Sequence, residues 1–547
     1  MPIAPAREST KELMFLPTNL IIGSGPAAAG VALALTQQRG QSVTVVDIGT
    51  QLEADRRRVV EAMTAHDRSQ WSSSDVAAIS RQPVGTNRGS LPEKRSYGSD
   101  FPFRDVGQLD GIHSDGRANR LVVSSAYGGF SNVWGAQTMP WSTPTFDRWP
   151  IKWSEMEPHY RSVLHEVPLT GSDDDLSELF PLLVDAQDPP KLAGRSRMVL
   201  DRYEARRRAV RAQGVTVGVA RLALNARACV RCGLCMTGCP YSLIYSASHT
   251  FDRLRAAGRI SYLPGLLAYR IGEQTGQSFA EVRDLASGGS QRLEADRIFV
   301  ACGAIGTTRL VLGSLGHFGR DVTLGESVQF ILPTFSSRAT IDPRAEDNFT
   351  LNQFNVVVDT DGGGLNLAQV HFYPYNPVFL ATLPAFLQAR FARIVTTSLL
   401  RRLSVGLGYL PSWESPRVHV VAQPAGDAML PTLSITGEDG PRIPPMLRTV
   451  MRRLLRAAPS LDLWPVLPKL VVSGAGKSYH FGGSFPHAGD GQRAVLETDR
   501  QGRLQAWDNV HLVDASVFPT VAATTFTLTI MANAHRIATE VIGGSNG

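Results

Sequence analysis

Short apolar runs that lead into glycine-rich loops are the main pattern in the first part of the chain. An apolar run at residues 20–22 enters a glycine loop, an alanine-rich segment continues to residue 38, and a second apolar run covers residues 43–46. This order predicts a strand, a helix and a second, parallel strand. A later apolar run at residues 297–302 is also followed by a glycine loop and a helical pattern. The pattern is typical of an α/β protein.

Further along the chain, apolar and polar positions alternate. Alternation near residues 280–284, 355–358 and 418–421 predicts strands with one buried face, as in an antiparallel sheet. The chain has 547 residues, which is more than one hydrophobic core usually serves. We therefore predict a mixed α/β fold with two or more domains, interleaved along the chain.

The loop after the first strand has the spacing of a dinucleotide-binding loop, with Ala28 at the third glycine position. Gly23 permits the tight turn, and Gly25 lets the backbone approach a pyrophosphate at the start of the helix. Asp47 ends the second strand, where its carboxylate can accept ribose hydroxyls. The loop, both strands, the helix and the carboxylate together predict binding of FAD or NAD. An ordinary strand-end aspartate is the alternative interpretation of Asp47.

Four of the five cysteines, Cys229, Cys232, Cys235 and Cys239, fall within eleven residues and are followed by Pro240. This is the C-x2-C-x2-C-x3-C-P pattern of bacterial ferredoxins, in which thiolates hold iron–sulfur clusters. Zinc is the alternative, because short C-x2-C spacings also suit a tetrahedral zinc ion. Zinc sites usually pair two such motifs across a longer loop, and no second Cys or His pair follows here. The pattern therefore favours iron–sulfur.

Composition narrows the class of protein. The chain is 43% hydrophobic and 19% charged, as in ordinary soluble globular proteins. Its net charge of +6 comes mostly from arginine, and no nucleic-acid-binding motif accompanies it, so we predict no nucleic-acid partner. No apolar run reaches the length that spans a bilayer. We expect a cytoplasmic protein.

The segment 377–410 combines apolar side chains with interleaved arginines. An apolar and basic amphipathic segment can lie in a membrane interface, which would make the protein peripheral at a membrane. The alternative is a buried helix of a substrate-binding domain with a solvated arginine face.

Motifs spread over nearly the whole chain resemble those of glucose–methanol–choline (GMC) FAD-dependent oxidoreductases. They are the glycine loop at 23–30, the loop at 128–135, the segment 302–310, the segment 480–484 and the closing segment 509–535. The resemblance implies FAD bound in a Rossmann-like domain that is interleaved with an antiparallel-sheet substrate domain. The implied FAD-binding parts are 15–150, 251–320 and 491–547, with substrate or cap helices at 151–220, the iron–sulfur loop at 221–250 and the substrate-binding domain at 321–490.

The resemblance also implies roles for single residues. The ADP half of FAD would be held by Gly23, Ser24, Gly25, Ala28 and Asp47. The isoalloxazine would lie beside Gly129, Ser131 and Asn132. The ribityl–pyrophosphate region would lie near Asp514 and Ala515.

The cysteine loop resembles that of FAD-dependent sugar dehydrogenases with a three-iron cluster on a C-x5-C-x3-C-P pattern. Cys229, Cys235 and Cys239 reproduce this spacing, and Cys232 is an additional cysteine. The fourth thiol favours a [4Fe–4S] cluster, with [3Fe–4S] as the second choice. A cluster suits an external electron acceptor, such as a quinone, cytochrome or ferredoxin, better than oxygen.

The catalytic base implied by the resemblance is His480, because an imidazole has a pKa suited to taking the hydroxyl proton. His487 is a weaker candidate. The second active-site position, usually His or Asn, is occupied by Thr525, with Phe526 where the family has proline. A threonine hydroxyl can hydrogen-bond a substrate but is a poor base.

These features predict an enzyme that oxidises a CH–OH group of a small-molecule alcohol, sugar or glycosylated intermediate, with FAD and a cluster as cofactors. Because Thr525 stands where the family usually has His or Asn, a second function stays open, that of a reductase or redox-neutral isomerase acting on an unsaturated metabolite. A third is a non-catalytic role in which the cluster is structural or senses oxygen.

Overall fold

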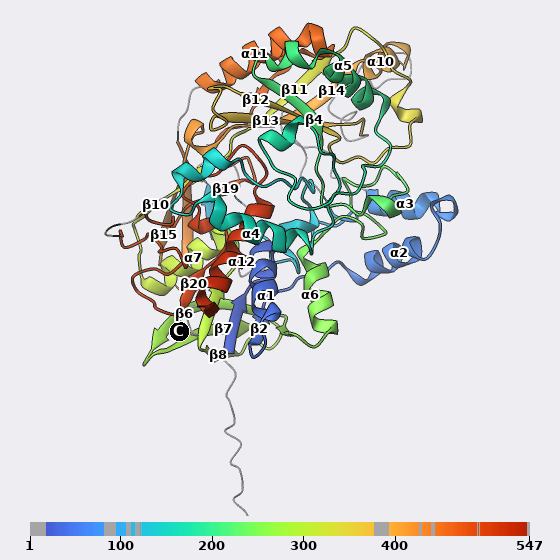
Figure 1. The fold of residues 1–547 in the computed structure, drawn as a ribbon. Helices are drawn as coiled ribbons and strands as arrows, with labels where there is room; N and C mark the ends of the chain where they lie inside the picture. Colours follow the sequence, from blue (N-terminus) through green and yellow to red (C-terminus); the bar gives the residue numbers. More distant parts are fainter. Residues whose placement is uncertain are drawn as a thin grey trace, which may run out of the picture.

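The computed structural model of the protein describes residues 18–80, 95–104, 111–114, 121, 123–376, 393–424, 426, 429–438, 443–489, 491 and 493–543. In the view of Figure 1, a parallel sheet with its helices forms the lower part, and a large antiparallel sheet forms the upper part. Chain segments far apart in the sequence build each part. The first half of the predicted segment 377–410 lies outside the described residues.

The lower part is built on a five-stranded sheet in which every neighbouring pair is parallel. The strand order is β20-β9-β1-β2-β5. Its strands are β1 (Thr18–Ile22), β2 (Ser42–Val46), β5 (Ser261–Leu263), β9 (Arg297–Val300) and β20 (Val510–Leu512). The predicted strands at 20–22, 43–46 and 297–302 are therefore confirmed in type and nearly in length.

Helices pack against this sheet and against one another. They are α1 (Pro26–Gln37), α4 (Trp153–Leu164), α6 (Ala247–Ala256), α7 (Ala304–Leu315) and α12 (Thr527–Gly543). The first and last helices, α1 and α12, lie side by side (Figure 1). A Cβ atom at Gly30 would lie 2.3 Å from the carbonyl oxygen of Met531, so glycine is required for this approach.

The upper part is a seven-stranded antiparallel sheet covered on one side by helices α5 (Gly194–Arg211) and α11 (Pro445–Leu461) (Figure 1). Its strands are β4 (Val215–Val219), β11 (Gln329–Phe335), β12 (Phe354–Asp359), β13 (Leu367–Tyr373), β14 (Leu403–Tyr409), β17 (Trp464–Pro465) and β18 (Val471–Val472). Alternate residues on β13 face opposite sides: Val370 and Phe372 join the core under the helices, and Gln369 and His371 face the other way.

Two smaller sheets complete the fold. One has the order β19-β10-β15-β16-β3 and the other β6-β7-β8. Their strands are β3 (Ile112–Ser114), β6 (Leu266–Gln274), β7 (Gln277–Asp284), β8 (Ser290–Ala295), β10 (Asp321–Glu326), β15 (Val418–Gln423), β16 (Thr432–Gly437) and β19 (Phe481–Gly482). The remaining helices are α2 (Ala54–Thr64), α3 (Ser73–Ser80) and α10 (Arg393–Leu400). Within the described ranges, every helix is too short or too polar to cross a membrane.

Candidate active site

The glycine loop between β1 and α1 has the backbone shape that a pyrophosphate site requires. Gly23 has a φ of 103°, and a Cβ atom there would lie 2.5 Å from the carbonyl oxygen of Ala301 on the neighbouring strand. Gly25 is the N-cap of α1, and a Cβ atom at this position would meet open space. No described side chain caps the helix here, so its first N–H groups remain available to an anion. Ala28 is fully buried in α1, where it packs the helix onto the sheet.

Asp47 lies at the end of β2, beside the glycine loop. Its carboxylate accepts hydrogen bonds from the Ser24 hydroxyl and from the Tyr262 hydroxyl, the latter at 3.1 Å. Burial raises the pKa of Asp47 to about 7, and the two hydroxyl donors oppose that rise. The Ser24 hydroxyl oxygen also accepts from the backbone N–H of Gly128 at 3.0 Å. Ser24, Asp47 and Tyr262 together fit the ribose end of a dinucleotide. The sequence analysis did not identify Tyr262.

The loop at 128–135 covers the glycine loop. A Cβ atom at Gly129 would lie 3.2 Å from the Cα atom of Gly25. The Asn132 side chain donates to the carbonyl oxygens of Tyr127 at 2.9 Å and Gly129 at 2.8 Å. Its amide thus shapes its own loop. Its predicted place beside the isoalloxazine stays a prediction.

Ser131 joins this loop to the N-terminus of α6. Its hydroxyl oxygen accepts from the backbone N–H of Ala247 at 2.9 Å and lies 3.1 Å from the Ser246 hydroxyl. Ser246 is the N-cap of α6. Ser246 lies seven residues after Cys239, the last cysteine of the loop. The partner of Ser131 is therefore close in sequence to the predicted cluster ligands.

Asp514 and Ala515 bring the C-terminal segment to the same edge of the parallel sheet. The Asp514 carboxylate accepts from the backbone N–H of Ser516 at 2.9 Å and from the Thr307 hydroxyl at the start of α7. Burial raises the pKa of Asp514. The carbonyl oxygen of Ala515 accepts from the backbone N–H of Gly483 at 2.9 Å, which fixes β19 against this segment.

His480 immediately precedes β19 and is therefore held next to the predicted cofactor segment. Its ring stacks on Tyr409 with centroids 4.7 Å apart, and it lies 4.8 Å from the ring of Phe526. Its Nδ1 atom is buried and has no hydrogen-bond partner among the described residues. Burial lowers the pKa of His480 to about 4, so the imidazole is neutral near pH 7. A neutral imidazole is the form that can accept a proton.

Glu326 holds the loop that carries His480. Its carboxylate is fully buried and accepts from the backbone N–H groups of Gly476 at 2.6 Å and Ser478 at 2.7 Å. The next residue, Ser327, donates its N–H to the carbonyl oxygen of His480 at 2.9 Å. Burial raises the pKa of Glu326 to about 7. No sequence motif points to this residue, because it is a single acid at the end of a strand.

Replacing Glu326 with glutamine should lower kcat with a smaller change in KM. The NH2 group of the new amide would face one of the two backbone N–H donors and repel it. The loop and His480 would therefore shift. A misplacement of about 1 Å can lower the rate roughly 100-fold. Steady-state kinetics together with FAD content would measure this. The matched control is Glu438→Gln, because Glu438 is exposed and accepts from Arg417. A normal kcat in Glu326→Gln would contradict the positioning role.

Thr525 precedes Phe526, whose ring lies 4.8 Å from that of His480, so the two predicted catalytic positions belong to neighbouring segments. The Thr525 hydroxyl donates to the carbonyl oxygen of Gln137 at 2.9 Å. With that hydrogen engaged, the oxygen can only accept a hydrogen bond from a substrate. Thr525 therefore does not replace an imidazole or amide donor.

The wall behind His480 contains polar side chains that sequence reasoning missed. His371 is buried on β13, and its ring lies 5.2 Å from that of Tyr409. Burial, followed by the proximity of His480, lowers the pKa of His371 to about 3. Several buried polar atoms of this region lack a hydrogen-bond partner within the described chain: Asn352 Oδ1, Asn355 Nδ2, Gln369 Oε1 and His371 Nε2. All of them are uncharged amide or imidazole atoms.

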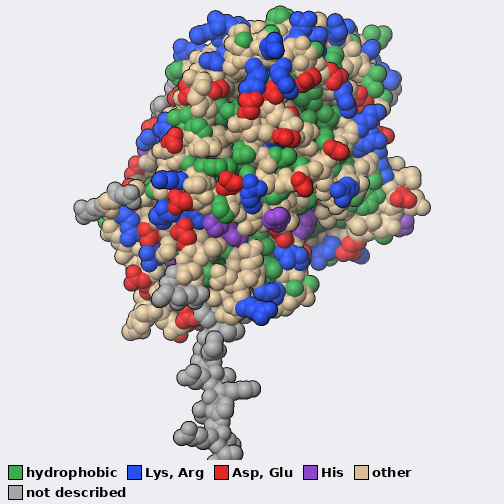
Figure 2. All heavy atoms as spheres, in the orientation of Figure 1, with side chains coloured by type: hydrophobic (Ala, Val, Ile, Leu, Met, Phe, Trp, Pro, Cys, Tyr) green, Lys and Arg blue, Asp and Glu red, His purple; other side chains and the backbone are tan. Residues whose placement is uncertain are grey.

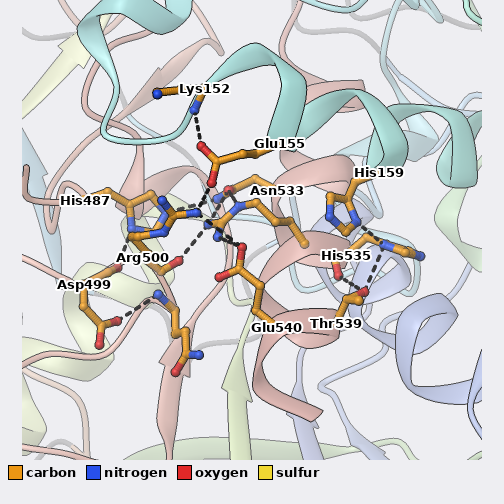
Figure 3. Close-up of polar contacts among 12 residues, drawn as sticks. Lys152, Glu155, His159, His487, Asp499, Arg500, Asn533, His535, Thr539 and Glu540 are labelled. Carbon is orange, nitrogen blue, oxygen red and sulfur yellow. Dashed lines mark hydrogen bonds and ion pairs between the residues drawn. The ribbon is translucent and has the colours of Figure 1, made fainter. Parts of the chain in front are cut away.

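His487, the weaker candidate base, belongs to a structural network on the other side of β19. Its Nδ1 donates to the carbonyl oxygen of Asp499 at 2.7 Å, and its Nε2 lies 3.3 Å from the Asn533 amide (Figure 3). The buried Arg536 donates to Asn533 and Glu540 in the same network. Both imidazole nitrogens of His487 are thus engaged, which excludes it as the base.

The cysteine loop turns sharply between its thiols. Arg231, Gly233 and Gly238 have φ values of 52°, 81° and 117°, in the left-handed region. Cys235 is buried, and its Sγ accepts from the backbone N–H of Thr350 at 3.3 Å.

The four thiols lie close enough to affect one another's ionisation. Burial and then the Cys235 thiol raise the pKa of Cys232 to about 12. Burial raises that of Cys239 to about 11, and Cys235 adds to the rise. Burial also raises the pKa of Cys229, with a smaller contribution from Cys235. Backbone N–H groups oppose these rises at all three of these thiols, as they would stabilise thiolates.

The positions of the cysteines leave both metal hypotheses, an iron–sulfur cluster and zinc, open. In the described part of the chain, no three His, Cys, Asp or Glu side chains converge so as to hold one metal ion. In a [4Fe–4S] cluster each cysteine binds a different iron, and neighbouring thiols that do not converge are compatible with it. The finding lends the cluster no direct support, and the cluster stays a prediction.

Comparisons with known proteins agree with the fold and with the C-terminal motif. Residues 457–534 match a protein-family model described as GMC oxidoreductase. The crystal structure of pyridoxine 4-oxidase from Mesorbium loti is similar to 96% of this chain and 99% of its own, with a TM-score of 0.58 and 15% sequence identity. No curated protein matches the sequence.

The C-terminal region, residues 457–534, is thus similar to GMC oxidoreductases, and the structural likeness extends over the fold of nearly the whole chain. Both findings support the predicted class, a FAD-dependent enzyme acting on CH–OH donors. The iron–sulfur branch of the predicted resemblance has no support from these comparisons.

Proposed function

We propose that this protein oxidises a CH–OH group of an alcohol, sugar or glycosylated intermediate, with FAD as the primary acceptor and His480 as the base. The observation that carries the proposal is the position of a neutral, partly accessible imidazole next to the segment of Asp514 and Ala515. The name of the structurally similar protein, an oxidase of pyridoxine, also supports oxidation of an alcohol.

The residues of this chain would divide the work as follows. FAD supplies a hydride acceptor when bound. The N-terminus of α1 and the loop of Gly25 would bind its pyrophosphate, and Asp47 its ribose. His480 would accept the hydroxyl proton at Nε2, because Nδ1 is buried. Tyr409 and Phe526 hold the imidazole in place and limit the access of water to it.

We further propose that Cys229, Cys232, Cys235 and Cys239 bind a [4Fe–4S] cluster, with [3Fe–4S] as the second choice, and that the chain serves an external acceptor such as a quinone, cytochrome or ferredoxin. The support is the ferredoxin spacing and the mutual proximity of the thiols. A hydrogen bond links the segment after this loop to the loop at 128–135, because the indole N–H of Trp134 donates to the carbonyl oxygen of Tyr245 at 2.8 Å.

A second candidate function is a reductase or redox-neutral isomerase acting on an unsaturated metabolite. The observation that favours it is the engaged hydroxyl of Thr525, which leaves this position without a donor for a substrate oxygen. Turnover that needs an electron donor, or that shows no net redox change, would support this alternative.

The test is anaerobic purification followed by quantification of FAD, iron and sulfide. We expect one FAD per chain and about four iron and four sulfide atoms. An alcohol or sugar from a screen with a dye acceptor should then bleach the flavin without oxygen. Bound zinc in place of iron would contradict only the proposed cluster. A flavin that is reduced by no CH–OH compound would contradict the proposed oxidation.

A further inference from the structure

The three most exposed large apolar side chains of the described residues share one surface. They are Ile394 at 84%, Val395 at 61% and Ile341 at 60% exposure, and we call them the apolar tip. Hydrogen bonds join their two segments: Thr340 donates its N–H to the carbonyl oxygen of Arg401 at 2.9 Å, and Arg401 Nε donates to that of Thr340 at 2.6 Å. Branched apolar side chains this exposed and this close together mark an interaction surface.

Five arginines lie in the same two segments as the apolar tip. They are Arg338, Arg344, Arg393, Arg401 and Arg402. Among the described residues, Arg344 forms an ion pair with Asp342 at 2.7 Å, and the other four arginines form none. Figure 2 shows basic side chains along the upper edge of the molecule, the side on which α5, α10 and α11 lie in Figure 1. The surface is therefore both apolar and strongly basic.

A groove beside the tip has the same charge. It encloses about 500 Å³ and is lined by four arginines and one acid: Arg197, Arg202, Arg206, Arg338 and Asp201. Arg195 connects the groove to the tip, because its guanidinium donates to the carbonyl oxygens of both Arg338 and Arg401. An anionic headgroup would find several guanidinium groups here.

We propose that this surface docks on an anionic lipid bilayer, with the apolar tip in the interface and the arginines on the lipid phosphates. Apolar side chains framed by basic ones are the pattern of interfacial membrane binding. A second copy of this chain is a poorer occupant, because a two-fold interface would bring the arginines of both copies together. The proposal does not depend on the proposed reaction.

Docking here would place the substrate site near the membrane. Strand β14 begins at Leu403, three residues after α10, and ends at Tyr409, which stacks on His480. Seven residues of strand span about 20 Å. A hydrophobic substrate or acceptor held in the bilayer would thus lie about one strand length from the base.

Vesicle co-sedimentation of the full-length protein tests the proposal. We expect binding to vesicles of phosphatidylcholine with about one-third phosphatidylglycerol, weak binding to phosphatidylcholine alone, and loss of binding as salt screens the arginines. The double variant Ile394→Glu, Val395→Glu should bind at least about tenfold more weakly. The control is Val495→Glu, since Val495 is 45% exposed and lies outside the tip, and it should bind as the original protein does.

Three results would overturn the proposal: unchanged binding of the double variant, equal binding to both kinds of vesicle, or a concentration-dependent dimer that the double variant abolishes. Thermal unfolding and FAD content of each variant confirm that it is folded. Reduction of the flavin by an alcohol in solution should be unaffected by the double substitution, so failure of the docking and failure of the reaction are separate results.

Discussion

Replacing His480 with asparagine is expected to slow reduction of the flavin by its alcohol substrate by about 100- to 10,000-fold, which is the usual contribution of a positioned base. The imidazole is neutral because burial lowers its pKa to about 4, and it lies against the segment of Ala515 that the cofactor is predicted to contact. Asparagine retains a polar side chain but cannot take the proton. Stopped-flow measurement of flavin bleaching under anaerobic conditions gives the rate directly.

The matched control is His419→Asn. His419 lies on β15, is partly exposed and bonds Asp321 at 2.8 Å, so its replacement should leave the rate unchanged. FAD content should be equal in both variants, since the Asp47 and Gly25 regions are untouched. A rate for His480→Asn within a few-fold of the original would show that the base is another group. The pH profile gives a second check: the rate should fall only as pH drops toward about 4, where His480 becomes protonated.

The features that the sequence predicted well depend on neighbouring residues. The turn at Gly23 and the carboxylate of Asp47 follow from one strand, one helix and the next strand, and these elements are where the pattern indicated. The alternation at 355–358 and 418–421 likewise predicted β12 and β15, because a strand with one buried face has a period of two.

The features that the sequence could not predict come from distant strands that meet only in the fold. Tyr262 reaches Asp47 because β5 pairs with β2, and no local pattern announces that pairing. Glu326 reaches the His480 loop because β10 pairs with β19. The sequence left open whether the segment 377–410 lies in a membrane interface or is a buried helix with a solvated arginine face; in its described part, α10 exposes Arg393, Ile394 and Val395.

The folded protein is expected to lose stability steeply as pH falls from about 6.5 to 4. Burial lowers the pKa values of six histidines from 6.5 to between about 3 and 4; they are His159, His371, His480, His487, His511 and His535. Below pH 6.5 the unfolded chain binds protons that the folded chain does not, so the free energy of unfolding decreases with falling pH. Burial raises the pKa values of five carboxyl groups, which act in the opposite direction but are fewer; they are Asp47, Asp174, Glu326, Asp359 and Asp514.

His371 offers the sharpest test of this acid sensitivity. It is 1% exposed, its Nε2 has no hydrogen-bond partner among the described residues, and its pKa of about 3 corresponds to as much as about 5 kcal/mol of stability lost by pH 3. His371→Leu removes the titrating group, so the melting temperature of this variant should fall less steeply between pH 6.5 and 4 than that of the original protein. His419→Leu, at a partly exposed histidine, is the matched control for the loss of a histidine side chain. Parallel slopes for all three proteins would mean that His371 binds its proton with the same pKa in the folded and the unfolded chain, which would contradict the burial of an unpartnered ring and require a different arrangement of the wall behind His480.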